Sequence, residues 1–364
     1  MRSSKWITLI CLAVLFFAAC QEEEKVMITA PVTIDETPYV LEYGTFPPPN
    51  LPADNPLTVA GVQLGRMLFY EKELSKDGSQ ACADCHRQTD GFSDARQFSI
   101  GVEGLAGRRQ AMPVFNLAWH SNEFFWDGRA TRLRDQALKP IEDPLEMNET
   151  LPQVIAKLSQ SKMYQDQFTR AFGEATIEAS KIALALEQFM LSIVSYQSKF
   201  DQYRAGTVQL SASEARGLTL FTTEYNPFFP ASSGADCAHC HGGINFENDQ
   251  YMNNGLDSET TISDIGRAEV TGNAEDRAKF KVPTLRNVAI TGPYMHDGRF
   301  ETLAEVIDHY NEGIQSSATT DPTVLNTQAT GLFLTEQDKV DLINFLKTLT
   351  DEQFLKEPAF ASPF

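Results

Sequence analysis

The chain contains little cysteine and little histidine. There are six residues of each in a chain of 364, and Cys11 and Cys20 lie within the first twenty positions. The other four cysteines all belong to two copies of one short motif. No His-x-x-x-His pair follows either copy, which argues against a zinc centre completed by two histidines.

The chain also has few positively charged residues and few long apolar runs. Thirty lysines and arginines stand against 49 aspartates and glutamates, so the formal charge is −19. That balance argues against a nucleic-acid partner and favours a basic patch on a protein partner. The apolar run from Trp6 to Phe17 is too short to span a bilayer as a helix of the mature protein.

Two copies of Cys-x-x-Cys-His, at residues 82–86 and 237–241, are the most informative pattern in the chain. In this spacing two thiols form thioethers with the vinyl groups of a porphyrin, and the next histidine becomes an axial iron ligand. Two matches predict two covalently bound c-type haems, with zinc binding or a thiol redox pair as the alternatives. The predicted attachment and proximal-ligand residues are Cys82, Cys85, His86, Cys237, Cys240 and His241.

The first twenty residues have the pattern of an export signal. Arg2 and Lys5 precede the apolar run, which ends in Ala-Ala-Cys20. This ending resembles a bacterial lipoprotein signal, in which Cys20 becomes the lipidated first residue, although Phe17 replaces the usual aliphatic residue. We therefore expect an exported, periplasmic protein that meets a membrane only through a lipid at Cys20. A secreted soluble form or an uncleaved anchor is the alternative.

Helical periodicity dominates the rest of the chain. Helices are predicted at Thr58–Phe69, at Ser213–Phe221 with Ser213 as N-cap, at Ile177–Tyr203 and at Thr335–Leu349. Strand signals are few and short, so the predicted fold is all-α, with two cytochrome c-like haem domains, long connecting loops and few short strands.

The two haem motifs divide the chain into comparable halves, each preceded by a predicted helix. The polar, proline-rich segment before the first half is predicted to be a tether, with an ordered coil on a domain as the alternative. The predicted boundaries are 1–19 for the signal, 20–54 for the tether, 55–203 and 204–350 for the haem domains, and 351–364 for a C-terminal tail.

Five further motifs accompany the haem motifs. With them, most of residues 55–350 resembles the bacterial di-haem cytochrome c peroxidase family, which includes the MauG-type enzymes. The motifs are Phe125-Trp126-Asp127-Gly128-Arg129, Gln136-Ala137 with Pro140, Pro144-Leu145-Glu146-Met147, Pro283-Thr284-Leu285-Arg286-Asn287, and Pro293-Tyr294-Met295-His296-Asp297-Gly298.

Cleaving peroxide at haem iron needs an open iron position, a group that carries a proton between the two oxygens, and a polar group that orients the departing water. Glu146 and Gln136 match the family's residues on the distal side of the N-terminal haem, and we predict these two roles for them. Trp126 matches a tryptophan at the domain junction and is predicted to relay electrons between the haems. Packing beside a haem alone is the alternative for Trp126.

The sixth iron ligands decide which branch of the family the chain resembles. In peroxidases with an inactive resting form, a histidine about sixteen residues past the first motif caps the first haem. Val102 stands there and His120 is too far along, so we expect a five-coordinate N-terminal haem and a structural His120. For the C-terminal haem the family uses methionine or, in MauG-type proteins, tyrosine. The matching residue is Tyr310, with His309, Met295 and Met252 as rivals.

The resemblance also implies a calcium ion between the two haem domains, held by one side-chain amide and by backbone carbonyls. The matching residues are Gln110, where the family usually has asparagine, and Thr291 and Pro293. His296 lies close to these positions and is expected to hydrogen-bond near the second haem, whereas His239 is expected to be exposed.

The leading hypothesis is a peroxidase that reduces hydrogen peroxide to water. Electrons from a small redox protein, a cytochrome c or a cupredoxin, would enter through the C-terminal haem. A MauG-like oxidase, which modifies a protein or another substrate through a bis-ferryl state, is the alternative among enzymes. A di-haem electron carrier without catalysis is the third hypothesis, and a homodimer is left open.

Overall fold

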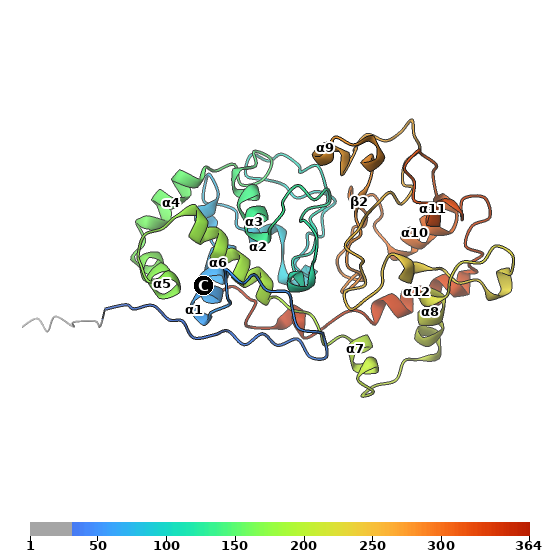
Figure 1. The fold of residues 1–364 in the computed structure, drawn as a ribbon, viewed down its shortest axis with the longest axis horizontal. Helices are drawn as coiled ribbons and strands as arrows, with labels where there is room; N and C mark the ends of the chain where they lie inside the picture. The colour runs from blue at the N-terminus through green and yellow to red at the C-terminus, as the bar shows by residue number, and fades with distance from the viewer. Residues whose placement is uncertain (1–30) are drawn as a thin grey trace, which may run out of the picture. The chain divides into compact units, whose positions relative to one another are not determined.

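Helices joined by long loops make up most of the structure, a computed structural model that describes residues 31–364 (Figure 1). The sheet in this range has two antiparallel strands, β1 (Tyr251–Met252) and β2 (Phe280–Lys281). This helix-rich fold with few short strands confirms that part of the predicted fold class. The predicted signal peptide and Cys20 lie outside the described residues. None of the helices in residues 31–364 has both the length and the apolar character that crossing a bilayer requires.

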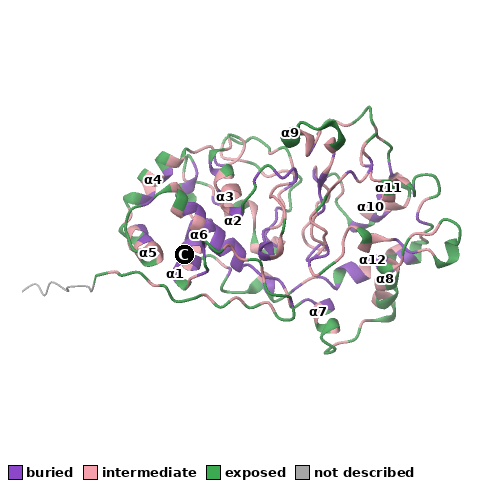
Figure 2. Ribbon diagram, in the orientation of Figure 1, coloured by how far each residue is buried: buried purple, intermediate pink, exposed green. Residues whose placement is uncertain are grey.

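Residues 33–364 form one compact unit with two hydrophobic cores, which define an N-terminal and a C-terminal lobe. Figure 2 shows buried residues concentrated along α1 and α6. The helices of the N-terminal lobe are α1 (Val59–Phe69), α2 (Cys82–Cys85), α3 (Leu133–Glu142), α4 (Leu151–Ser159), α5 (Lys162–Phe172) and α6 (Ala179–Ser192). Those of the C-terminal lobe are α7 (Lys199–Arg204), α8 (Ala212–Thr222), α9 (Ala268–Thr271), α10 (Leu303–Asp308), α11 (Pro322–Leu325) and α12 (Glu336–Lys347).

Side-chain caps fix where the principal helices begin. Thr58 accepts a hydrogen bond from the Gly61 N–H at the start of α1, and Thr335 forms a capping box with Asp338 at the start of α12. Both predicted starts are confirmed. The predicted N-cap Ser213 is wrong, because Ser211 caps α8 by pairing with the glutamate three residues later.

The long helix predicted over Ile177–Tyr203 is wrong, since the chain is extended between α6 and α7. Side chains far away in sequence bind the backbone of this break. The Ser195 N–H donates to Asn116 Oδ1 (2.7 Å), and the N–H groups of Tyr196 and Gln197 donate to Asp351 Oδ2 (3.0 and 2.8 Å). These bonds replace the helical ones that the break removes.

Each lobe contains one close helix crossing that depends on a glycine. A Cβ atom on Gly65 of α1 would lie 1.9 Å from the Ala185 carbonyl oxygen of α6. In the C-terminal lobe a Cβ on Gly217 of α8 would lie 2.0 Å from the Asp341 carbonyl oxygen of α12. In each lobe, a glycine without a Cβ atom therefore allows the first and last long helices to approach closely.

Both ends of the described chain pack on the N-terminal lobe. Residues 33–54 form a coil bound to it by hydrogen bonds, such as that from Trp119 Nε1 to Pro47 O (2.9 Å). At the other end, Arg66 donates to backbone carbonyls of residues 358 and 361, and Phe354 and Phe360 lie in the N-terminal core. The lobe is thus completed by the last residues of the chain.

The helix crossing predicts an unusual response to Gly65→Ala. Alanine normally stabilises a helix by about 1 kcal/mol relative to glycine. Here the added methyl group meets backbone, so we expect the holoprotein to lose roughly 1–3 kcal/mol of unfolding free energy. Chemical denaturation checks this, with Gly107→Ala as the matched control because its new Cβ would meet nothing nearer than 3.6 Å. Equal stabilities of the two variants would contradict the prediction.

Candidate haem-binding sites

The first Cys-x-x-Cys-His motif forms the short helix α2, and His86 follows as its C-cap. His86 Nδ1 lies 3.0 Å from the Phe92 carbonyl oxygen. Because a carbonyl only accepts, Nδ1 must donate, and the lone pair of Nε2 is left for a metal. Burial lowers the pKa of His86, which keeps the ring neutral.

The second motif repeats this arrangement. Cys237 opens the 3₁₀ turn η5 (Cys237–His239), and His241 Nδ1 lies 3.1 Å from the Phe246 carbonyl oxygen. Burial lowers the pKa of His241 to about 4. Each ring is therefore neutral at pH 7 and fixed in the tautomer that an axial haem ligand requires.

The cysteines do not have the properties of a redox pair. All four are free, and burial raises the pKa of Cys82 and Cys237 to about 12. A reactive thiol pair needs the opposite shift. Among the described residues, the one group of three clustered metal-ligating side chains contains no cysteine, so a zinc half-site is not supported either. The donor set therefore fits covalent haem.

Glu146 and Gln136 line the same cavity as the first motif. This cavity has a volume of about 530 Å³, part of it open to solvent, and is bordered by His86 and by Pro140 of α3. Burial, with a smaller contribution from Asp143, raises the pKa of Glu146 to about 7. A carboxyl group that titrates near neutrality can both accept and return a proton.

The loop around Val102, where the family resemblance would place a capping histidine, contacts the backbone of Glu146. The Val102 N–H donates to the Glu146 carbonyl oxygen (2.9 Å). A Cβ on Gly101 would lie 2.6 Å from that oxygen, so the loop packs directly on the Glu146 backbone. His120 lines neither motif's cavity, and its Nδ1 lies 2.8 Å from Asp249 Oδ1.

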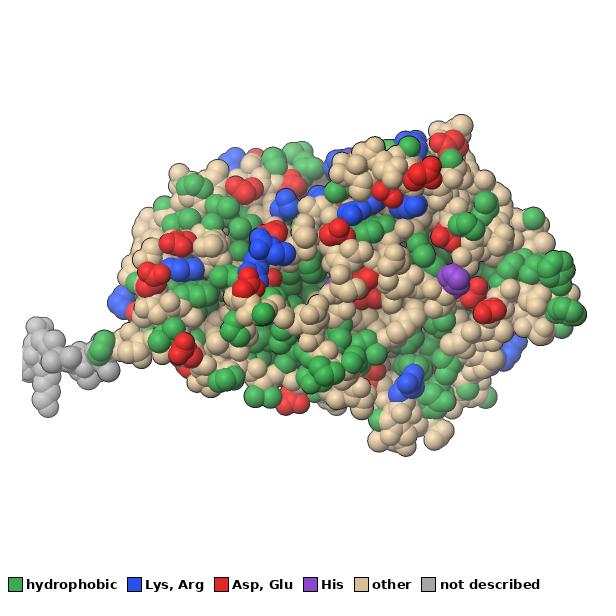
Figure 3. All heavy atoms as spheres, in the orientation of Figure 1, with side chains coloured by type: hydrophobic (Ala, Val, Ile, Leu, Met, Phe, Trp, Pro, Cys, Tyr) green, Lys and Arg blue, Asp and Glu red, His purple; other side chains and the backbone are tan. Residues whose placement is uncertain are grey.

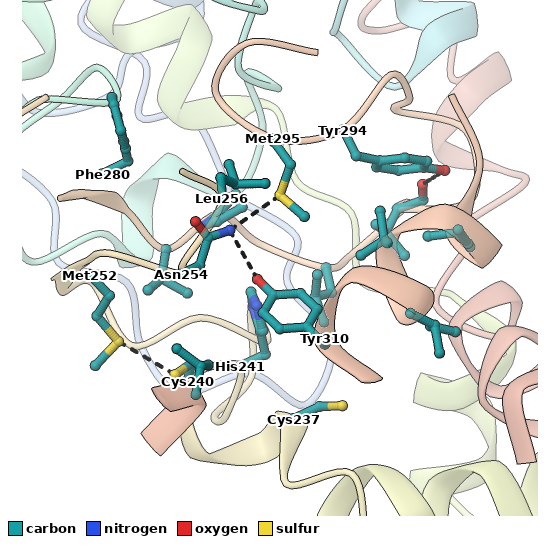
Figure 4. A pocket seen from close by; sticks show the side chains of 18 of the residues that line it. Cys237, Cys240, His241, Met252, Asn254, Leu256, Phe280, Tyr294, Met295 and Tyr310 are labelled. Atoms are coloured by element: carbon teal, nitrogen blue, oxygen red, sulfur yellow. Dashed lines mark hydrogen bonds between the residues drawn. The ribbon is translucent and has the colours of Figure 1, made fainter. Parts of the chain in front are cut away.

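The second motif borders a larger cavity of about 1700 Å³, part of it continuous with solvent. Three of the four predicted sixth ligands line it, namely Tyr310, Met252 and Met295. Figure 4 shows the Asn254 amide between two of them, and its Nδ2 lies 3.3 Å from both Tyr310 Oη and Met295 Sδ. Met252 instead lies beside Cys240, with 3.4 Å between the sulfur atoms.

His309 turns away from this cavity. Its Nε2 lies 3.0 Å from the Asn254 carbonyl oxygen, and the ring is buried beside Phe300. The π-helical turn η7 (His309–Gly313), which continues α10, contains both His309 and Tyr310. Burial raises the pKa of Tyr310 to about 12, so the phenol is neutral unless a cation stabilises its ionised form.

An internal repeat relates the two cavities. The segments Phe124–Ala130 and Tyr294–Phe300 each close with a bridge between their end residues, and both lead into a helix that lines a cavity. Positions 126 and 296, 136 and 306, and 140 and 310 are each 170 apart. Pro140, which has no metal-binding atom in its side chain, therefore occupies in the first cavity the position that Tyr310 occupies in the second.

Trp126 belongs to the N-terminal repeat segment but lines the C-terminal cavity. Its Nε1 donates to the Gln110 carbonyl oxygen (2.8 Å), while the Gln110 N–H donates to the His296 carbonyl oxygen (2.8 Å). Gln110 thus joins the two repeat segments. His296 stacks on Phe280 with 3.6 Å between ring centroids, and burial lowers its pKa to about 4.

The residues matched to the calcium site also border this cavity. Gln110, Thr291 and Pro293 all line it. The hydrogen bonds of the Gln110 side chain run from Nε2 to Ser93 Oγ and to the Asp94 carbonyl oxygen (3.1 and 3.2 Å). Its amide oxygen remains available as the hard donor that Ca²⁺ prefers. His239, expected to be exposed, is exposed.

Two polar residues at these sites were not predicted from the sequence. Asn254 faces the rival ligands of the second cavity, and the sequence signal was the run Asn253-Asn254-Gly255 after β1. Gln80 lines the first cavity, where its Nε2 lies 3.3 Å from Cys85 Sγ and its Oε1 is buried without a partner. Its position two residues before Cys82 was the available signal.

Comparisons with known proteins agree with this geometry. A family model described as di-haem cytochrome c peroxidase matches residues 59–209. The chain is 36% identical over 302 residues to the methylamine utilization protein MauG of Methylophilus methylotrophus, covering 82% of this chain and 84% of that protein. It is 35% identical over 298 residues to the cytochrome c551 peroxidase of Nitrosomonas europaea, covering 80% of each. A solved MauG-like protein associated with microbial copper homeostasis is 34% identical, with a TM-score of 0.77 over 88% of this chain and 97% of that one.

The environment of Glu146 predicts a carboxyl group that titrates near pH 7 in the folded protein. Infrared difference spectra recorded from about pH 3 to about pH 9 should contain a protonated-carboxyl band that disappears with a midpoint near 7, because burial disfavours the charged form. The band should be missing in Glu146→Gln. A midpoint near 4.5, the ordinary glutamate value, would contradict the assignment.

Proposed function

Since the chain belongs to the di-haem cytochrome c peroxidase family, we propose that it reduces hydrogen peroxide to water with two electrons from a small redox protein. The observation that carries the proposal is the first cavity, where Glu146 and Gln136 border the same space as His86. A carrier without catalysis has no use for an acid and an amide at this place. Two cytochrome c-like domains, residues 55–203 and 204–350, would each hold one haem through the cysteines and histidine of its motif.

When bound, the haems supply the redox chemistry and the iron position at which peroxide is cleaved. Glu146 takes a proton from the near oxygen of peroxide and returns it to the far oxygen, which leaves as water. The Gln136 amide orients that departing water by hydrogen bonding. Two further protons and two electrons then complete the reduction of one peroxide to two waters.

Electrons are proposed to enter at the C-terminal lobe and to pass through Trp126. This indole is 7% exposed and is fixed by its hydrogen bond to Gln110, which suits a rigid relay between the lobes. The loop after α8 exposes Phe228 and Phe229, which are 85% and 66% accessible, near Tyr225 of the second cavity. Figure 3 shows apolar side chains gathered there, a surface on which a cytochrome c or cupredoxin could dock.

A MauG-like oxidase that modifies a protein or other substrate is the second candidate. Tyr310 favours it, because an anionic oxygen ligand stabilises oxidised iron whereas methionine raises the potential. Met295 shares the Asn254 amide with Tyr310 and is the rival within the same cavity. The optical spectrum of Tyr310→Phe distinguishes the two ligands, since a methionine-ligated haem would be unchanged.

Two further proposals rest on the family resemblance and the sequence. Calcium would bind Gln110 Oε1 and the carbonyls of Thr291 and Pro293, and chelation followed by metal analysis tests this. Export with a lipid on Cys20 would place the protein in the periplasm, and mass spectrometry of the mature N-terminus tests that.

The proton-carrier role predicts that Glu146→Gln lowers kcat/KM for peroxide by about a hundredfold or more. In the unchanged protein, kcat/KM should fall tenfold per pH unit below about 7, because the first transfer needs the carboxylate. The variant should lose this dependence. Glu142→Gln, an exposed neighbour at the end of α3, is the control and should leave both the rate and its pH profile unaltered.

The peroxidase proposal predicts that stopped-flow addition of peroxide, followed by reduced cytochrome c, consumes two donor molecules for each peroxide. A long-lived oxidised spectrum with negligible donor oxidation would instead support the MauG-like candidate. No reaction with peroxide at all would leave only an electron carrier and would overturn both enzyme proposals.

A further inference from the structure

A cluster of three metal-ligating side chains lies apart from the haem motifs. His120, Glu247 and Asp249 each offer one ligand atom, and these three atoms lie within 4.8 Å of one another. His120 Nδ1 is 2.8 Å from Asp249 Oδ1 and 3.5 Å from Glu247 Oε1. The side chains are 10%, 5% and 13% exposed in the order His120, Glu247, Asp249, so the cluster is nearly enclosed.

The backbone holds this cluster in place from both lobes. His120 ends the 3₁₀ turn η3 (Leu117–Trp119) of the N-terminal lobe, and the next residue, Ser121, binds Asp249 Oδ2 through its N–H (2.9 Å) and its hydroxyl (2.8 Å). The Asn122 amide donates to the Asp249 carbonyl oxygen (2.9 Å). Asp249 itself has a left-handed φ of 57°. The three side chains are therefore presented by fixed loops.

Glu247 has an oxygen that the protein does not satisfy. Its Oε1 accepts from the Asn245 amide (3.2 Å), but its Oε2 is buried without a hydrogen-bond partner. A buried carboxylate oxygen without a donor destabilises the protein, and more so when it is charged. A bound cation would remove this destabilisation.

We propose that His120, Glu247 and Asp249 form a binding site for a Zn²⁺-like divalent metal ion. Zinc bonds of about 2.0–2.2 Å to nitrogen and carboxylate oxygen separate neighbouring ligand atoms by roughly 3.3 Å in a tetrahedron. The separations of 2.8 and 3.5 Å from His120 Nδ1 lie on either side of that value. His120 also borders a polar cavity lined by residues such as Asn50 and Arg134, which gives an ion a path inward.

Lys281 determines which metals the site can hold. Its ammonium lies 3.3 Å from Asp249 Oδ1 and its side chain is 2% exposed, so it competes with a bound cation. A hard ion held only by charge, such as Ca²⁺, binds poorly beside this ammonium. Zinc gains a strong imidazole bond that Ca²⁺ does not, and Asp249 Oδ1 has a second lone pair for the lysine.

The site would join the lobes beside the proposed electron relay. His120 comes from the N-terminal lobe, and Glu247 and Asp249 come from the C-terminal lobe. The Lys281 N–H donates to the Trp126 carbonyl oxygen (2.8 Å), which connects the cluster to the Trp126 segment. The metal's role is therefore structural, and the inference does not depend on which substrate the enzyme oxidises.

Isothermal titration of the tag-free, two-haem protein with ZnCl₂ tests the site. We expect one saturable Zn²⁺ per chain, weakened about a hundredfold by His120→Ala and tenfold or more by Glu247→Gln. Lys281→Met removes the competing charge and should tighten binding tenfold or more. Tighter zinc binding cannot result from poor folding, so the Lys281→Met variant tests the site even if the other variants fold poorly. His239→Asn removes the exposed imidazole of the second motif and should leave the stoichiometry at one.

X-ray absorption at the zinc edge should then report one imidazole nitrogen and two or three oxygens. Three results would overturn the proposal, since each would make the cluster an ion-pair network only. They are the lack of saturable binding, binding that survives both His120→Ala and Glu247→Gln, and an affinity that Lys281→Met leaves unchanged or lowers.

Discussion

The arrangement of both haem sites depends on one hydrogen bond, from an imidazole Nδ1–H to a backbone carbonyl five or six residues later. In both lobes the carbonyl belongs to a phenylalanine with left-handed backbone, Phe92 at φ 55° and Phe246 at φ 54°. This conformation is unfavourable for a bulky residue. It persists because each ring is buried in its lobe's core, so packing of the phenylalanine fixes the tautomer of the histidine.

The internal repeat gives the two cavities different side chains at a few matching positions. The repeat places Gln136 where the second lobe has Val306, and Pro140 where it has Tyr310. The first cavity thereby has an amide where the second has an apolar side chain, and the second has a phenol where the first has a proline. The 99–107 loop holds the Glu146 backbone, through the hydrogen bond from the Val102 N–H and the close contact of Gly101. Under the proposed function, these exchanges separate peroxide cleavage from electron entry without a change of fold.

The sequence predicted what local chemistry determines and missed what distant residues decide. The motif residues follow from spacing alone, and the starts of α1 and α12 follow from their capping threonines. The break between α6 and α7 could not be predicted, because its hydrogen bonds come from distant residues. Asn116 and Asp351 lie 79 and 156 positions away from Ser195. Tyr310 and His309 could not be separated by pattern either, since a π-helical turn rotates one into the cavity and the other out of it.

The packing of Phe354 and Phe360 in the N-terminal core has a consequence for biogenesis. Because the chain is synthesised from its amino end, Cys82 and Cys85 are made long before those two aromatic side chains. Until then the leading lobe lacks part of its hydrophobic interior. The core of the lobe that is made first is therefore complete only when the 354–360 segment has been added.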